Sequence, residues 1–120
     1  MIHLGCAGWN LSRLHAEHFP LHGTHLQRYA GRLNAVEVNS SFYRAHRSQT
    51  YARWAASVPE HFRSAVKLPK AITHEHRLQG CAGLLERFLD ECGHLGDRLG
   101  CLLVQLPPSL ASGGAVVHAF

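Results

Sequence analysis

Glu37 and Lys67 are the two residues whose types and positions most directly suggest chemistry. Glu37 lies within the alternating segment VEV at 36–38, and Lys67 lies within the similar segment SAVKL at 64–68. A carboxylate and an amine that share a pocket can act as an acid/base pair, because burial and mutual charge tune their pKa values. The same two residues could instead form a structural ion pair, and the sequence leaves both interpretations open.

Polar and aromatic residues that follow the short apolar segments could contact a ligand. Asn39 and Ser41 could hydrogen-bond a polar ligand, or they could cap backbone groups of a turn. Tyr43 could form an aromatic wall for a ring, or it could anchor a loop on the core. Trp9 and Gln105 follow two other apolar segments, where each could contact a ligand or only fill space and bond to its neighbours.

Basic residues gather in the same stretches of the sequence. With Lys67 they predict a positive surface suited to a phosphate, a carboxylate or a nucleic-acid backbone, and a solvated basic loop is the alternative. The formal net charge of +4, with histidines neutral, permits such a partner and does not require one. The residues are Arg44, Lys70, His74 and Arg77.

Eleven histidines and four cysteines raise the question of metal binding. His74 and His76 form an H-x-H pair, but metal binding needs converging ligands, usually with a carboxylate or a cysteine, and the other histidines are interpreted as loop and surface residues. No pair of cysteines has C-x-x-C spacing, so we expect reduced and mostly buried thiols. The sequence therefore predicts no metal site and no cofactor, and it predicts that Cys6 faces the helices and is no nucleophile.

Strand and helix patterns alternate along the chain, and these elements would position the candidate groups. The predicted strands are 2–6, 35–39, 62–68 and 101–106. The predicted helices are 24–33, 48–58 and 81–95. Such alternation indicates a parallel sheet with helices packed on it.

The period of two along a strand decides which side chains share a face. Counting along the strands puts Glu37, Asn39, Lys67 and Gln105 on one face, opposite the apolar residues that should meet the helices. Charged residues at corresponding places in two strands fit a β/α barrel better than an open sheet covered on both faces. We therefore predict an α/β fold, a partial (βα)-barrel that is TIM-barrel-like, with about four parallel strands and three helices.

Four uncommon stretches follow one another in a specific order. They are GCAGWN at 5–10, VEVNSSFYR at 36–44, FRSAVKLPKAITHEHRL at 62–78 and LVQLPPS at 103–109. Together they resemble the DUF72 family, also called YecE-like proteins, over roughly residues 2–109. The resemblance implies a β/α barrel and an uncharacterised biochemical function. Cys6 and Ala7 stand where the family motif usually has two hydroxyl residues, which argues against a hydroxyl contact from the first loop.

The resemblance also implies a division of the chain. Residues 1–109 correspond to the N-terminal half of a DUF72-type barrel, and 110–120 form a tail that matches no family motif. Because family members continue through a second half, we expect a truncated or frameshifted member or an expressed fragment. Half a barrel leaves the first and fourth strands unpaired, so we expect a homo-oligomer through these edges, or a tail that covers one of them.

Three functions stay open at this point. The first is a barrel enzyme, or its remnant, that acts on a small polar or anionic substrate, with Glu37 as acid/base and Lys67 stabilising negative charge. The second is a nucleic-acid-binding or nuclease-like protein that uses the basic rim. The third is a non-catalytic ligand-binding or assembly module.

The sequence also predicts where the protein works. No apolar run reaches the about 18 residues that a membrane span needs. The first residues, MIHLGCAGW, carry no basic region ahead of an apolar stretch, as a signal peptide would. We therefore expect a cytoplasmic protein with no membrane partner.

Overall fold

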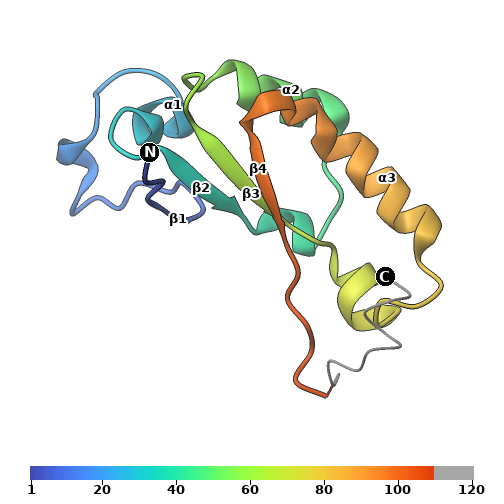
Figure 1. Cartoon of the computed structure of the whole chain (residues 1–120). Helices are drawn as coiled ribbons and strands as arrows, with labels where there is room; N and C mark the ends of the chain where they lie inside the picture. Colours follow the sequence, from blue (N-terminus) through green and yellow to red (C-terminus); the bar gives the residue numbers. More distant parts are fainter. Residues whose placement is uncertain (110–120) are drawn as a thin grey trace.

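One parallel sheet organises residues 1–109, the part of the chain that this computed structural model describes (Figure 1). Its strands lie in chain order, and all three neighbouring pairs are parallel. The strands are β1 (Gly5–Ala7), β2 (Ala35–Val38), β3 (Arg63–Lys67) and β4 (Leu99–Leu103).

Three helices connect the successive strands. They are α1 (His25–Ala30), α2 (Ser48–Ala56) and α3 (Ala82–Cys92). Since connections between parallel strands are right-handed, an unbroken strand order places all connecting helices on one face of the sheet. This is the arrangement of a β/α barrel, whereas a doubly wound sheet reverses its strand order and uses both faces. The predicted α/β fold, with four parallel strands and three helices, is confirmed.

Short helical turns fill the loops of the fold. They are the 3₁₀ turns Ala16–His18, Ser40–Phe42 and Gly93–Arg98 and the π-helical turn Ala71–Glu75. The turns at 40–42 and 71–75 directly follow the C-terminal ends of β2 and β3, which point downward in Figure 1. They therefore stand where barrel proteins carry their chemistry.

The outer strands begin and end elsewhere than predicted. β1 covers Gly5–Ala7 in place of 2–6, and β4 covers Leu99–Leu103 in place of 101–106. In β4 the pairing shifts, because Ser64 opposes Leu99 while Ala65 opposes Cys101, which leaves Gly100 as an extra residue. Such a bulge starts the strand earlier than an uninterrupted alternation indicates. As a result Gln105 lies beyond the end of the strand.

The start of β1 depends on a close approach between two backbones. A side-chain carbon at Gly5 would lie 1.9 Å from the carbonyl oxygen of Ala35, so only glycine fits. The hydroxyl of Tyr29, from α1, accepts a hydrogen bond from the Cys6 amide at 2.7 Å and donates one to Ala35 at 2.6 Å. Burial raises the pKa of Tyr29, which keeps this donor protonated. One tyrosine thus joins the outer strand to its neighbour.

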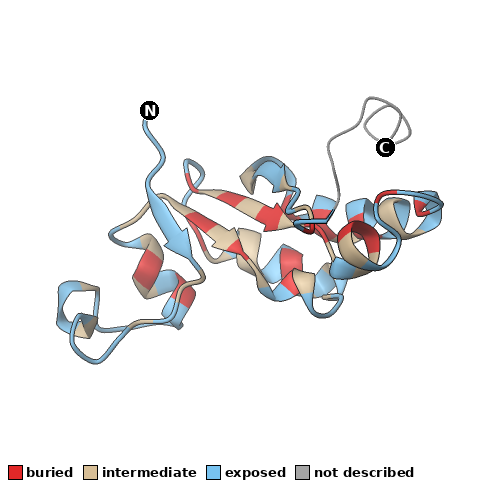
Figure 2. Ribbon diagram, turned by 90° about the horizontal axis from the view of Figure 1, so that it is seen from below, coloured by how far each residue is buried: buried red, intermediate tan, exposed pale blue. Residues whose placement is uncertain are grey.

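The core lies between the two middle strands and the helices (Figure 2). β2 and β3 alternate between buried and half-buried residues, whereas all of β1 is exposed and no residue of β4 is buried. The largest fully buried apolar side chains are Tyr51, Phe62, Leu68, Ile72, Leu95, Val38 and Val66. Burial therefore follows the middle of the sheet.

The cysteines correct the prediction that the thiols are mostly buried, and they qualify the prediction that Cys6 faces the helices. All four are free thiols, but only Cys81 and Cys92 are buried, whereas Cys6 and Cys101 are exposed. Cys6 opposes Val36 on the face that meets the helices, as its parity predicts, yet its side chain is exposed. Burial raises the pKa of Cys92 to about 11, so this thiol stays protonated at neutral pH.

None of the helices within the described residues combines the length and the apolar composition that crossing a membrane would require.

Candidate functional site

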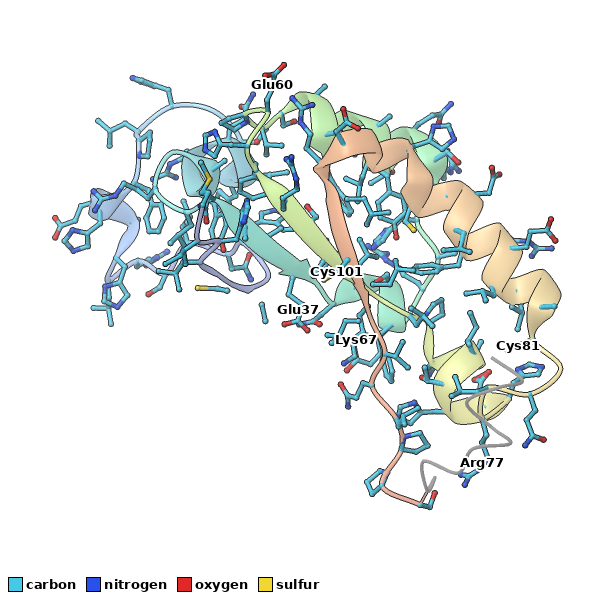
Figure 3. The ribbon with its side chains drawn as sticks, viewed as in Figure 1. Glu37, Glu60, Lys67, Arg77, Cys81 and Cys101 are labelled. Carbon is cyan, nitrogen blue, oxygen red and sulfur yellow. The ribbon has the colours of Figure 1, made fainter. Side chains whose placement is uncertain are left out.

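β2 and β3 direct Glu37 and Lys67 to the same face of the sheet. Glu37 opposes Ala65 across the two strands, and Lys67 lies two residues further along β3, so the period of two returns it to that face. Both side chains are half-buried. Figure 3 shows both leaving the sheet near the C-terminal ends of their strands. The shared face matches the prediction, whereas the catalytic role of the pair stays a prediction.

Lys67 is held by an aromatic ring. Its Nζ lies over the ring of Phe42, 4.4 Å from the centroid. Within residues 1–109, no N–O distance of 4.0 Å or less joins Lys67 to the carboxylate of Glu37. A cation over a ring face gains about 0.5–1 kcal/mol at exposed sites and more when water is excluded. The geometry therefore supports a positioned amine beside a carboxylate in place of a structural ion pair.

The turn after β2 is fastened to the end of β3 by Ser41. This residue is buried, and its hydroxyl donates to the carbonyl oxygen of Lys67 at 2.7 Å, with the carbonyl of Val38 at 3.2 Å as the second acceptor within reach. A hydroxyl has one proton, so the shorter contact is the hydrogen bond. Of the two interpretations of Ser41, backbone capping is the one that this geometry supports.

Trp9 and Asn39 line a hollow of about 310 Å³ at the C-terminal ends of β1 and β2. We call it the mouth hollow; its lining is Ala7, Gly8, Trp9, Asn10, Asn39 and Ser40. The Oδ1 atom of Asn39 is buried and has no hydrogen-bond partner among the described residues. Gly8, with a φ of 80°, turns the chain so that its amide donates to the carbonyl of Glu37 at 2.8 Å. The mouth hollow therefore lies next to the C-terminal end of β2, where its lining residue Ala7 opposes Glu37, although Glu37 itself is not part of the lining.

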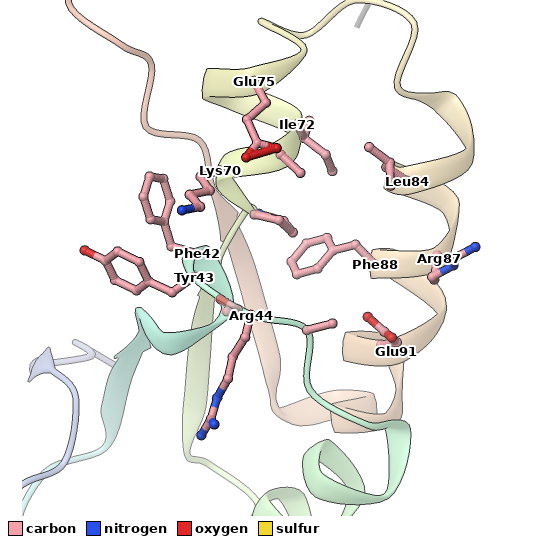
Figure 4. A pocket seen from close by; sticks show the side chains of 14 residues that line it. Phe42, Tyr43, Arg44, Lys70, Ile72, Glu75, Leu84, Arg87, Phe88 and Glu91 are labelled. Atoms are coloured by element: carbon pink, nitrogen blue, oxygen red, sulfur yellow. The ribbon is translucent and has the colours of Figure 1, made fainter.

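A second hollow, of about 260 Å³, lies between the two turns after β2 and β3 and the helix α3 (Figure 4). Its wall is apolar at Ile72 and at Phe88, which projects from α3 into it. We call it the helix-side hollow; the predicted site residues that line it are Ser41, Tyr43, Arg44 and Lys70. Its charged lining is completed by Glu75, Arg87 and Glu91.

The predicted basic rim does not converge on one point. Arg44 and Lys70 belong to the helix-side hollow, and the Arg44 side chain extends away from Phe88 (Figure 4). The guanidinium of Arg77 donates to the hydroxyl and the carbonyl of Ser109, at 2.9 Å and 3.2 Å. The basic residues belong to the two connections that follow β2 and β3, and Arg77 is turned toward Ser109 by a contact that sequence alone does not reveal.

Two further predicted site residues lie outside both hollows. The His74 ring packs edge-on against Phe42 at 5.1 Å, and its Nδ1 lies 2.8 Å from the hydroxyl of Thr73. Gln105 is exposed beyond the end of β4. Among residues 1–109, no three histidine, cysteine or acidic side chains are grouped so that they could hold a metal ion.

Sequence reasoning missed the role of His46. Its Nε2 lies 2.7 Å from the hydroxyl of Ser40, and its ring packs edge-on against Tyr51 and Trp54 of α2. Trp54 in turn contacts Trp9 at 4.9 Å between ring centroids. Burial, and then the charge of Arg44, lowers the pKa of His46. No spacing rule points to a serine and a histidine six residues apart in a loop, so only the structure could find this contact.

Comparison with known proteins places these features in context. A family model described as "Protein of unknown function DUF72" matches residues 3–120. The chain is 32% identical over 107 residues to the UPF0759 protein YecE of Escherichia coli K12, a match that spans 89% of this chain and 38% of that protein. The protein of the same name from Escherichia coli O157:H7 matches to the same extent. The chain therefore spans well under half the length of these relatives.

Solved structures show the same fold. Two crystal structures of a DUF72 family protein from Enterococcus faecalis V583, at 3.10 Å and 2.52 Å resolution, align with TM-scores of 0.77 and 0.66. The identities are 24% and 21%, and each alignment spans 99% of this chain and 44% or 45% of the other. At such identities the likeness speaks for the fold alone. Residues 110–120 lie outside the described part of the chain, so the domain boundary at 109 stays a prediction.

Proposed function

Because the chain belongs to the DUF72 family, whose function is unknown, we propose an activity from the chain's own side chains. We propose that it carries the reaction face of a barrel enzyme that acts on a small polar or anionic substrate. Glu37 serves as general acid/base, and Lys67 stabilises the negative charge that develops on the substrate. A single observation carries this proposal: Glu37 and Lys67 share one face at the C-terminal ends of neighbouring strands.

The surroundings of the pair support these roles. Both side chains are half-buried, and fixed charges act more strongly on a bound substrate where water is partly excluded. Phe42 holds the amine of Lys67 without neutralising it, which leaves its N–H groups available to an oxygen atom of the substrate. Ser41 fixes the turn that carries Phe42 to the end of β3, so the amine is oriented before a substrate arrives.

No specific observation favours nucleic-acid binding as a second function. That alternative needs basic groups that follow a phosphate backbone along one surface. Here Arg77 is bonded to Ser109, and Arg44 and Lys70 border a hollow beside α3. The proposal therefore concerns a small substrate.

The experiment is a turnover screen followed by a matched pair of amide substitutions. The chain is incubated with pools of small sugars, carboxylates, phosphate esters and amides, and NMR spectra of the pools reveal any compound that is converted. The expected result is that Glu37→Gln abolishes conversion while binding of the converted compound persists, since only the proton-transfer group is lost. Glu60→Gln is the control, because Glu60 is exposed and borders a hollow with Arg63, Asp97 and Arg98, away from the strand ends of the pair. Equal conversion rates in the two variants would contradict the role of Glu37.

A further inference from the structure

The lining of the mouth hollow points to a class of ligand. Resting on the proposed function, we infer that this hollow takes an uncharged polyhydroxyl compound, a polyol or a small saccharide, beside Glu37. The observations are the uncharged polar lining, an unpartnered buried acceptor and an indole wall.

Among residues 1–109, the mouth hollow is lined by uncharged side chains alone. Asn10, Asn39 and Ser40 offer amide and hydroxyl groups, which both donate and accept hydrogen bonds. A row of hydroxyl groups on a ligand needs this mixture, because each hydroxyl also donates once and accepts. A charged group placed here without a counter-charge would lose its hydration without compensation. The lining therefore favours a neutral, hydrogen-bonding ligand.

Asn39 supplies a second and independent observation. Its Oδ1 is buried and has no partner among the described residues. An unsatisfied buried acceptor costs about 1–3 kcal/mol, and native structures usually satisfy such groups with water or a ligand. Which end of the amide faces inward is an assignment that a 180° turn of the group reverses. The buried end of the amide is closed off from solvent, so a ligand hydroxyl at the strand end meets the exposed part of Asn39, or the buried end after the side chain rotates.

Trp9 adds an apolar surface and one hydrogen-bond donor, the indole N–H. Its ring contacts Trp54 edge-on, with an angle of 76° between the ring planes, so α2 holds it in place. An indole surface packs against the C–H groups of a sugar ring, and the indole N–H donates to a hydroxyl. Ser40 is fixed as well, because its hydroxyl lies 2.7 Å from His46. The donors and acceptors of the hollow are thus held by the surrounding structure.

Glu37 and Lys67 lie outside the lining of the mouth hollow, but Glu37 opposes the lining residue Ala7 across β1 and β2, so both suit a ligand that extends beyond the hollow. A carboxylate accepts from a hydroxyl and an ammonium donates to one, so a polyol can engage both without carrying a charge itself. Arg44 and Lys70, basic groups that attract an anion, border the helix-side hollow instead, together with Arg87 and the acidic Glu75 and Glu91. The two ligand classes therefore separate in space, and an experiment can distinguish them.

The test is a titration of the ¹⁵N-labelled chain followed by NMR. The probes are glycerol, sorbitol, glucose and cellobiose, with inorganic phosphate in a separate series at constant ionic strength. The expected result is that at least one neutral probe shifts the Trp9 indole N–H and the Asn39 amides, with an affinity that salt does not change. Asn39→Ala then weakens that binding about 5- to 100-fold, which corresponds to the loss of one buried hydrogen bond.

Two variants complete the design. Gln49→Ala is the matched control, because it removes an exposed amide from α2 and should leave the affinity unchanged. Asn10→Ala removes an exposed amide from the same hollow, so it tests the site without disturbing a buried group if Asn39→Ala does not fold.

The outcomes separate the two proposals. If phosphate shifts Trp9 and Asn39 while no neutral probe does so at up to about 100 mM, the polyol inference is wrong and the proposed reaction face stands. If a neutral probe binds as expected but Glu37→Gln leaves conversion unchanged, the ligand class stands and the proposed role of Glu37 fails. If no probe of either class shifts these residues, the polyol inference is wrong, and the turnover screen with Glu37→Gln decides the proposed function separately.

Discussion

The two middle strands and the two outer strands of this sheet have different surroundings, although their sequences look alike. Val38 of β2 and Val66 of β3 are 2% and 0% exposed. Leu102 of β4 opposes Val66 directly, yet it is 36% exposed, and Leu4, just before β1, is 68% exposed. The same alternation of apolar side chains thus produces a core only where a neighbour lies on each side.

The middle strands supply the core and the candidate site, whereas the outer strands supply the edges of the sheet that are unpaired in the described part of the chain. The middle strands bury their apolar face and present Glu37 and Lys67 on the other, so one pair of strands supplies both the core and the candidate site. The outer strands leave apolar side chains and one backbone edge without a partner among residues 1–109. Unpaired edges invite association with another chain. Pairing of these edges between copies of the chain stays a proposal.

The largest expected effect comes from shortening a leucine in each region. Leu68 follows β3 and is 1% exposed, so Leu68→Ala should lower the free energy of unfolding by about 2–5 kcal/mol through lost burial and a cavity. Leu102→Ala should cost less than about 1 kcal/mol, because the side chain is already partly in water. Urea unfolding followed by circular dichroism measures both values. Equal losses of unfolding free energy in the two variants would show that the middle and outer strands do not differ in burial as described.

A smaller loss is expected where the two middle strands are fastened together. Ser41→Ala removes the donor to the Lys67 carbonyl and leaves a partly buried acceptor without it, at a cost of about 1–3 kcal/mol. The turn that carries Phe42 should loosen as well, and NMR of the Lys67 amine should report that the amine has left the ring. Ser12→Ala, in an exposed loop, is the control and should change neither measurement.

The pairing of the outer strand β1 with β2 depends on Tyr29, so a substitution there tests whether an outer strand opens independently of the middle strands. Tyr29→Phe removes the hydroxyl that bonds to Cys6 and Ala35, which should cost about 1–2 kcal/mol for two hydrogen bonds. Because the bonds join β1 to β2, the Cys6 amide should exchange with solvent much faster while amides of β3 stay protected. Uniform loss of protection across the sheet would show instead that the outer strand is no separate unit.

Much of this architecture could be predicted from the sequence. Alternation in 35–39 and 62–68 gave the two middle strands and the shared face of Glu37 and Lys67, because the period of two is local and survives small errors in strand bounds. The helix over 81–95 was equally regular, and α3 lies within it. The bounds of β4 were wrong because the bulge at Gly100 depends on pairing with β3, which no local pattern encodes.

The candidate site was predicted less completely. The residue types that follow the strands could be identified, but their grouping depends on contacts between loops that are far apart in the sequence. Phe42 contacts both Lys67, which lies on β3, and His74, which lies in the turn after β3. Arg77 is directed toward Ser109, which is 32 residues away. Such contacts decide that Arg44 and Lys70 border one hollow and that Trp9 and Asn39 border another.

The smallest expected effect concerns pH, and it compares a packed histidine with an exposed one. The pKa of His46 is lowered by burial and by Arg44, so the unfolded chain takes up this proton more readily than the folded chain. The neutral histidine therefore stabilises the fold above about pH 6.5, and this stabilisation is lost as the pH falls below that value. His46→Gln should reduce the loss of unfolding free energy between about pH 7 and pH 5, whereas His22→Gln, at an exposed position, should leave it unchanged. If the unfolding free energy of the two variants varied with pH in the same way, protonation of His46 would not contribute to the pH dependence of stability.

The most direct test of the account is a double-mutant cycle on Glu37 and Lys67, with the compound that the screen or the titration identifies. Two side chains that act on one ligand at one face should be coupled, so Lys67→Met should have a smaller effect in the Glu37→Gln background than in the native chain. The account predicts a coupling of at least about 0.5 kcal/mol in the binding or turnover of that compound, whereas distant and independent sites add within about this amount. Strictly additive effects, with each substitution as harmful in the presence of the other as alone, would show that the two residues do not serve a common site.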